Sequence, residues 1–310
     1  MQTLTSVSDR VRELVGSGEY FWLDLEAPSE DDLNRLVELA GVSARCARDA
    51  ARWGESPHLR EYHEQLFLVF YGGDVEVHLF VSARWVVTVH GRPAPMLDRL
   101  REQLAEATVA PAARVVARIL GSLADSYNDI LDPIDDRLQE IEQQVAAAQG
   151  SMVGTRALRE EVLEHRGHLL RTARVVRRQR DYLDRGVGDI ERLPGVEPAT
   201  SHDLRDVVNE MIRVGDRVDD ALGRLAAALE LLNATMANRL NLVTERLTVV
   251  ATIFLPLTVV TSFFGMNFDW MTGRIDTFGA FLVLGVGLSV GSGLAIWTYV
   301  RRRLERGLSD

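Results

Sequence analysis

The chain has 310 residues, of which 46% are hydrophobic and 26% are charged, a composition typical of ordered rather than disordered proteins. Its formal net charge is −10, and every basic side chain other than histidine is arginine. Because phosphate binding needs a basic surface, this charge disfavours nucleic acid as a partner. The single cysteine, Cys46, excludes an intramolecular disulfide and is interpreted as a small buried apolar side chain.

Residues 1–110 are predicted to form a small α+β domain. A strand-like segment at 21–25 precedes a helix that ends near Ala40, for which Ser29 is the candidate N-cap. Three β-rich runs follow at 65–71, 75–81 and 84–90, and they predict an antiparallel meander. A helix is predicted after them, over 96–107. The domain has no phosphate loop, nucleophile elbow or dinucleotide fingerprint, so no enzyme activity is expected.

Residues 111–246 are predicted to form a helical stalk, because apolar residues recur there at steps of three and four. The expected helices cover about 114–149, 151–185 and 200–246. The second has nine arginines against five acidic residues, whereas residues 186–235 have ten acidic residues against five arginines. Opposite charges on successive helices favour antiparallel pairing.

Two uncharged segments near the C-terminus are predicted to span a membrane. Residues 247–264 form an uncharged run of 18, and residues 278–300 form one of 23, long enough for helices across hydrocarbon. No breaker separates the last stalk helix from the first span, so one helix is expected from about 200 to 264. The alternative is that such a segment is a buried helix in a soluble core. Two such segments in tandem favour membrane spans over this alternative.

Arginine placement predicts the orientation of these spans. Arginines precede the first span and fill the tail at 301–310, whereas the loop at 265–277 has only Arg274. Because short cytoplasmic segments carry excess positive charge, both termini are expected in the cytoplasm and the loop outside. The prediction is a multi-pass protein of the bacterial plasma membrane, with the lipid bilayer as a partner.

Two helices cannot enclose an aqueous path, so the hairpin must oligomerise to conduct ions. Copies around an axis through the first span would turn its polar positions into rings, with the amide of Asn267 at the outer mouth. The other candidates for such rings are Asn241, Thr244, Thr248 and Thr258. Mg²⁺ loses its water reluctantly, so a neutral oxygen ring can hold the hydrated ion through that water and still release it.

The segment TIFLPLTVVTSFFGMNF, residues 252–268, resembles the CorA family of divalent-cation channels and transporters. The signature is Gly265-Met266-Asn267 at the outer end of the penultimate helix, which the resemblance identifies as the ion entrance. It implies a homopentameric funnel that takes up Mg²⁺, and often Co²⁺ or Ni²⁺, driven by the membrane potential. It also implies that intracellular Mg²⁺ bound between cytoplasmic domains closes the pore.

The resemblance also implies roles for residues along the long helix. The family's pore-facing positions fall on Asn241, Thr244, Leu247, Leu255 and Thr258. Leu247 and Leu255 would form a hydrophobic constriction that gates by dewetting. The acidic positions tied to regulation fall on Asp206 and Glu230, for which solvated surface acids are the alternative.

Two alternatives stay open. Many relatives follow the signature with an acidic residue beside a Met-Pro turn, whereas this chain has Asp269-Trp270-Met271-Thr272-Gly273, so its ion preference is open. The ZntB branch, which transports Zn²⁺, shares the same architecture. A membrane-anchored coiled-coil scaffold without conduction is the alternative from another class. No partner protein other than further copies of the chain is predicted.

Overall fold

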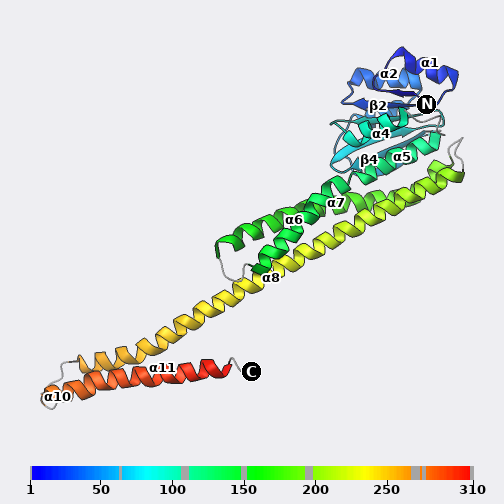
Figure 1. Cartoon of the computed structure of the whole chain (residues 1–310). Coiled ribbons are helices and arrows are strands. Elements are labelled where there is room, and N and C mark those ends of the chain that lie inside the picture. Colours follow the sequence, from blue (N-terminus) through cyan, green and yellow to red (C-terminus); the bar gives the residue numbers. More distant parts are fainter. Residues whose placement is uncertain are drawn as a thin grey trace. The chain divides into compact units, whose positions relative to one another are not determined.

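A computed structural model describes the chain except for residues 1, 63–64, 106–111, 148–151, 193–197, 267–272, 274–276 and 308–310. It separates into two compact units, Met1–Glu230 and Leu231–Asp310, and each is considered by itself (Figure 1).

The first unit contains a six-stranded sheet with the strand order β1-β2-β6-β5-β4-β3. The strands are β1 Gln2–Leu4, β2 Phe21–Glu26, β3 His58–Tyr62, β4 Gln65–Gly72, β5 Val75–Val81 and β6 Trp85–His90. Strands β3 to β6 pair antiparallel in sequence order, which confirms the predicted meander and adds β3 to its edge. Strand β2 pairs parallel with both β1 and β6, so the sheet is mixed.

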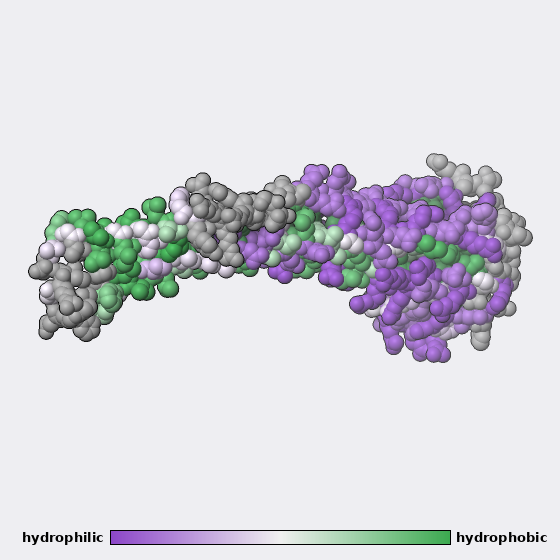
Figure 2. Space-filling model, turned by 90° about the horizontal axis from the view of Figure 1, so that it is seen from below, coloured by the Kyte–Doolittle hydropathy of each residue, from purple (hydrophilic) through white to green (hydrophobic). Residues whose placement is uncertain are grey.

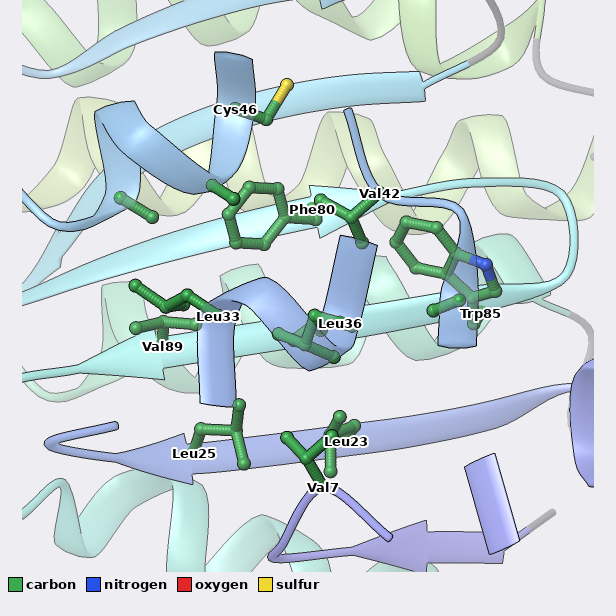
Figure 3. Packing of buried hydrophobic residues seen from close by; sticks show 14 of the residues in the cluster. Val7, Leu23, Leu25, Leu33, Leu36, Val42, Cys46, Phe80, Trp85 and Val89 are labelled. Atoms are coloured by element: carbon green, nitrogen blue, oxygen red, sulfur yellow. The ribbon is translucent and has the colours of Figure 1, made fainter. Parts of the chain in front are cut away.

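Three short helices pack against one face of this sheet: α1 Asp9–Ser17, α2 Glu30–Ala40 and α3 Ala44–Ala50. Figure 3 shows Leu33 and Leu36 of α2 in one cluster with the strand residues Phe80 and Val89. Ser29 caps α2 as predicted, because its side chain accepts a hydrogen bond from the backbone of Asp32 at 3.2 Å and Asp32 bonds back to the backbone of Ser29.

Cys46 of α3 lies in the same apolar core and is 1% exposed. Burial raises the pKa of its thiol to about 11. The thiol is therefore protonated at neutral pH and unreactive, which agrees with the apolar interpretation of this residue.

A buried polar network crosses β2 and β6. Trp22 donates to the Thr88 hydroxyl at 2.9 Å, and Thr88 donates to the carboxylate of Asp24 at 2.5 Å. The same carboxylate lies 3.2 Å from His90 and 3.3 Å from Arg101 of helix α4, Pro95–Ala105. Asp24 and His90 are each 3% exposed, so the charged partners compensate each other away from water.

Four long helices follow α4: α5 Ala112–Asp125, α6 Asn128–Ala147, α7 Met152–Glu191 and α8 Pro198–Phe264. The single helix expected over 114–149 is therefore two helices. The chain turns at Ser126 and Tyr127, where the Ser126 hydroxyl donates to the carbonyl of Leu123 and Tyr127 is buried. Pro133 does not end α6 but lies inside it.

The side chain of Gln179 joins α7 to the sheet. It accepts from the backbone N–H of Tyr71 at 2.7 Å and donates to the carbonyl of Tyr71 at 3.2 Å. Strand β3 ends its pairing with β4 at Val69, so Gln179 satisfies backbone groups that the sheet leaves unpaired. Gln179 is fully buried.

The second unit contains the end of α8, then α10 Phe278–Ala280, a π-helical turn over Phe281–Gly287, and α11 Leu288–Gly307. The segment expected as one span over 278–300 thus begins with three α-helical residues and a π-helical stretch, and helix continues into the tail. Within the described residues, one helix, Ser201–Phe263, is long and apolar enough to cross a membrane, and Leu282–Thr298 is a shorter apolar helix. Figure 2 shows hydrophobic residues gathered on this unit and hydrophilic residues covering most of the first.

Candidate functional site

The predicted ion entrance begins where α8 ends. The backbone N–H of Gly265 donates to the carbonyl of Thr261 at 2.9 Å, and that of Met266 donates to Phe263 at 3.3 Å. A Cβ atom on Gly265 would lie 3.1 Å from the Thr261 carbonyl, so a side chain would crowd this turn. Asn267, the residue expected to hold the hydrated ion, lies outside the described residues.

Three of the predicted residues line one groove on the second unit. Leu255, Thr258 and Met266 border an apolar groove of about 620 Å³ that runs along the end of α8. Leu255 is 71% exposed within a single chain. Predicted pore-facing residues therefore share one continuous surface with the start of the predicted entrance.

The predicted residues nearer the first unit do not belong to this groove. Asn241, Thr244 and Leu247 lie about two to four turns before Leu255 along α8, and all three are exposed. Leu247 is 68% exposed, although a leucine in a soluble core would be buried. The single chain offers nothing in its described part that covers these positions.

Threonine hydroxyls along α8 bond to the helix itself. Thr248 donates to the carbonyl of Thr244 at 2.8 Å, and Thr258 donates to that of Phe254 at 2.8 Å. The hydroxyl hydrogen is thereby used within the helix, whereas the oxygen keeps lone pairs that can accept. An acceptor on the helix surface suits water bound to a cation, because such water donates its hydrogens.

Asp206 lies in a mixed-charge cleft of about 540 Å³ between α5 and α8. It is 3.4 Å from His202, one turn earlier on α8. The other charged residues of the cleft are Arg114, Arg118, Asp125, Asp203, Glu210 and Arg213. Among the acidic residues of the cleft, only Asp206 was predicted, although the spacing of Asp203, Asp206 and Glu210 by three and four residues places them on one helical face.

Charge crowding in this cleft is visible at Asp125. Burial raises the pKa of its carboxyl, the negative charge of Glu210 raises it further, and Arg213 opposes both. Arg114 lies 3.2 Å from Asp203, so part of the negative charge is neutralised within the chain. A cation here would relieve the remaining repulsion.

The two predicted regulatory residues are not brought together. Glu230 is exposed and lies 24 residues after Asp206 on the same helix, a separation of about 36 Å at 1.5 Å per residue. Within the described residues, no group of three or more His, Cys, Asp or Glu side chains could hold a metal ion. Any ion at Asp206 or Glu230 would need further ligands.

Comparison with known proteins shows the same fold. The complete structure of the CorA magnesium transporter from Methanocaldococcus jannaschii superimposes with a TM-score of 0.78. The match covers 91% of this chain and 90% of that one, at 20% sequence identity. The chain therefore shares the fold of that protein.

Two curated relatives are named for different cations. The cobalt/magnesium transport protein CorA of Thermotoga maritima is 23% identical over 282 residues, which cover 86% of this chain and 78% of that protein. The zinc transport protein ZntB of Yersinia enterocolitica is 24% identical over 225 residues, covering 68% and 65% respectively. The model of the CorA-like Mg²⁺ transporter protein family matches residues 17–302. The chain therefore belongs to the CorA-like Mg²⁺ transporter family.

Proposed function

We propose that the protein is a homopentameric channel for divalent cations, with Mg²⁺ as the main cargo and Co²⁺ or Ni²⁺ as further cargo. The observation that carries this proposal is the exposure of α8. Its most apolar 18-residue window is 0% buried inside the chain. Family membership supplies the class of transport, and the exposed helix supplies a surface for lipid and for further copies.

In this proposal the residues of α8 form successive rings around one axis. The neutral amide of Asn267 holds a hydrated ion at the entrance, with Gly265 and Met266 forming the turn that presents it. Thr244, Thr258 and Asn241 then accept hydrogen bonds from the ion's water. Neutral oxygens bind Mg²⁺ loosely enough for release, whereas carboxylate rings would hold it more tightly.

Leu247 and Leu255 form the gate in the same arrangement. Both are large apolar side chains that are exposed in the single chain, at 68% and 71%. Five leucines in a ring around a narrow axis exclude water, and an ion cannot pass without its hydration shell. A small rotation of α8 would open or close such a constriction.

Cytoplasmic Mg²⁺ is proposed to close this gate through Asp206 and Glu230. Both lie on α8, the same helix that contains Leu247 and Leu255. The excess of carboxylates around Asp206 favours a bound cation, and a neighbouring copy would supply the ligands that one chain lacks.

The proposed topology places both termini in the cytoplasm of a bacterium. The segments 247–264 and 278–300 cross the plasma membrane, and the loop that contains Asn267 faces outside. Arg239 and Arg246 before the first span and the arginines after the second support this orientation.

Zinc transport is the second candidate, because a zinc transport protein is among the relatives. The test is uptake into liposomes that contain the purified protein, under an inside-negative potential, with Mg²⁺, Zn²⁺, Co²⁺ and Ni²⁺ offered singly and in competition. We expect Mg²⁺ to enter and Co²⁺ to compete with it. Preferred entry of Zn²⁺ would support the zinc alternative, and no flux through folded protein would support a scaffold.

A further inference from the structure

Helix α7 has a second apolar surface besides the one that packs into the first unit. Its buried side includes Val162, Leu169, Val176 and Leu183. Leu163 and Leu170 lie on another side and are 46% and 47% exposed. They are seven residues apart, the repeat of a helix that packs against another helix.

Arginines accompany these two leucines on the same side of α7. Arg159, Arg166 and Arg174 are exposed and alternate with the leucines at steps of three and four, and in the described part of the chain none of them forms a salt bridge or a hydrogen bond. By contrast, Arg156 pairs with Glu160 and Arg177 pairs with Asp219. We call Arg159, Leu163, Arg166, Leu170 and Arg174 the α7 seam.

Helix α8 of the first unit has a complementary surface. Ile212 is 38% exposed, and Asp216 and Asp220 are exposed and form no salt bridge among the described residues. We call these three residues the α8 strip. Gly223 and Ala227, which follow Asp220 along the same side of α8, are small residues that would let another helix approach closely.

The acidic residues of α6 are less suited as partners, because most of them are already engaged. Asp132 and Asp135 bind Arg217, and Glu142 binds Arg224. Asp216 and Asp220 of the α8 strip, by contrast, are exposed and form no salt bridge with an arginine in the described part of the chain.

A single chain leaves the α7 seam and the α8 strip uncovered. Arg177 of α7 binds Asp219 of α8 at 2.6 Å, and Val176 packs near Gly215, so the two helices already meet through other residues. We propose that the α7 seam of one copy packs against the α8 strip of a neighbouring copy. This inference rests on the proposed homo-oligomer and identifies the surfaces that join its subunits.

The test reverses charges on the full chain and measures assembly by light scattering in detergent over a dilution series. Arg166→Glu with Arg174→Glu reverses the seam, and Asp216→Arg with Asp220→Arg reverses the strip. Each pair should weaken self-association at least about tenfold at physiological salt, since two attractive contacts become repulsive. All four substitutions together should restore it. Arg171→Glu with Arg178→Glu, exposed on α7 beside the seam, is the matched control and should change assembly little.

Several results would overturn the inference. The seam–strip contact would be contradicted if neither reversal changed assembly. It would also be contradicted if assembly was lost in the reversals and the fourfold variant did not restore it. The α7 seam would be assigned to anionic lipid instead if two results were found together. The seam reversal would weaken binding to added vesicles in proportion to their phosphatidylglycerol content, and the strip reversal would have no effect on assembly. Circular dichroism checks that each variant keeps its helices, and the strip pair tests the same contact if the seam pair misfolds.

The same proteins separate this inference from the proposed function. If wild-type protein assembles through the α7 seam but passes no ion in liposomes, the contact stands and the transport proposal fails. If it transports Mg²⁺ and both reversals leave assembly intact, transport stands and the contact fails.

Discussion

The two units of the chain differ in whether their apolar side chains are buried. In the first, Phe67, Phe70 and Phe80 are fully buried on a sheet covered by helices. In the second, Phe254, Leu255 and Val259 are more than 60% exposed. The first unit therefore supplies its own core, whereas the second leaves these apolar side chains uncovered within one chain. Each prediction below tests one side of that contrast.

The largest expected effect is truncation of a core phenylalanine. Phe80→Ala should lower the free energy of unfolding by about 3–5 kcal/mol, because Phe80 is 1% exposed and packs 5.2 Å from the ring of Phe67. Urea denaturation followed by tryptophan fluorescence measures this. The matched substitution Phe254→Ala, at a side chain 63% exposed, should cost less than about 1 kcal/mol. Equal losses would mean that Phe254 is packed as tightly in the folded protein as Phe80 is.

Removing Gln179 should have the next largest effect. Gln179→Leu leaves the N–H and carbonyl of Tyr71 without their partner in a buried place, so a loss of about 2–3 kcal/mol is expected. The same denaturation experiment measures it. Gln143→Leu, at an exposed position of α6, is the control and should be nearly neutral. A neutral Gln179→Leu would show that water or relaxed backbone replaces these bonds.

Two serines offer a paired test of helix capping. Ser29→Ala removes the capping box of α2 and should lower stability by about 1 kcal/mol. Ser43 stands at the same position before α3, but its side chain makes no capping hydrogen bond, so Ser43→Ala should change stability by a few tenths. Thermal unfolding of both variants measures the two losses of stability. Equal losses in Ser29→Ala and Ser43→Ala would contradict the capping assignment.

The smallest expected effect is a pH dependence from His90. Burial opposes its charged form, but the carboxylate of Asp24, 3.2 Å away, outweighs burial and raises its pKa above the ordinary 6.5. A raised folded pKa gives stability that is full below pH 6.5 and is lost as the pH rises through the folded value. His90→Gln should remove this slope from melting temperatures measured across neutral pH. His202→Gln, 80% exposed, should keep it. A slope that survives His90→Gln would assign it to another group.

The features with a strong local pattern could be predicted from sequence. The uncharged run before Gly265, the repeat along 200–264 and the strands 65–90 depend on periodicity that neighbouring residues alone define. Strand β3 could not be predicted, because HLREY has no alternation and becomes a strand only through its pairing with β4. The junction at Tyr127 and the network of Asp24 and His90 depend on contacts between residues far apart in sequence.

The same distinction applies to the site. Leu255, Thr258 and Met266 share a groove, and the resemblance to the CorA family was what selected them as a set. The acidic residues around Asp206 come partly from α5, through Asp125, and no pattern along α8 indicates a contact with that helix. The side of a helix on which a residue lies can be predicted from spacing along the sequence. A cluster of residues from two different helices can be found only once the fold is known.

The central claim is that ions enter the second unit at the Gly265-Met266-Asn267 turn. Mg²⁺ uptake into liposomes, compared between wild type, Asn267→Ala and the loop control Thr272→Ala, tests it most directly. The account predicts that Asn267→Ala loses uptake while the protein stays folded and assembled, and that Thr272→Ala keeps it. Equal uptake by all three proteins would contradict the claim and show that the amide of Asn267 only ends a helix.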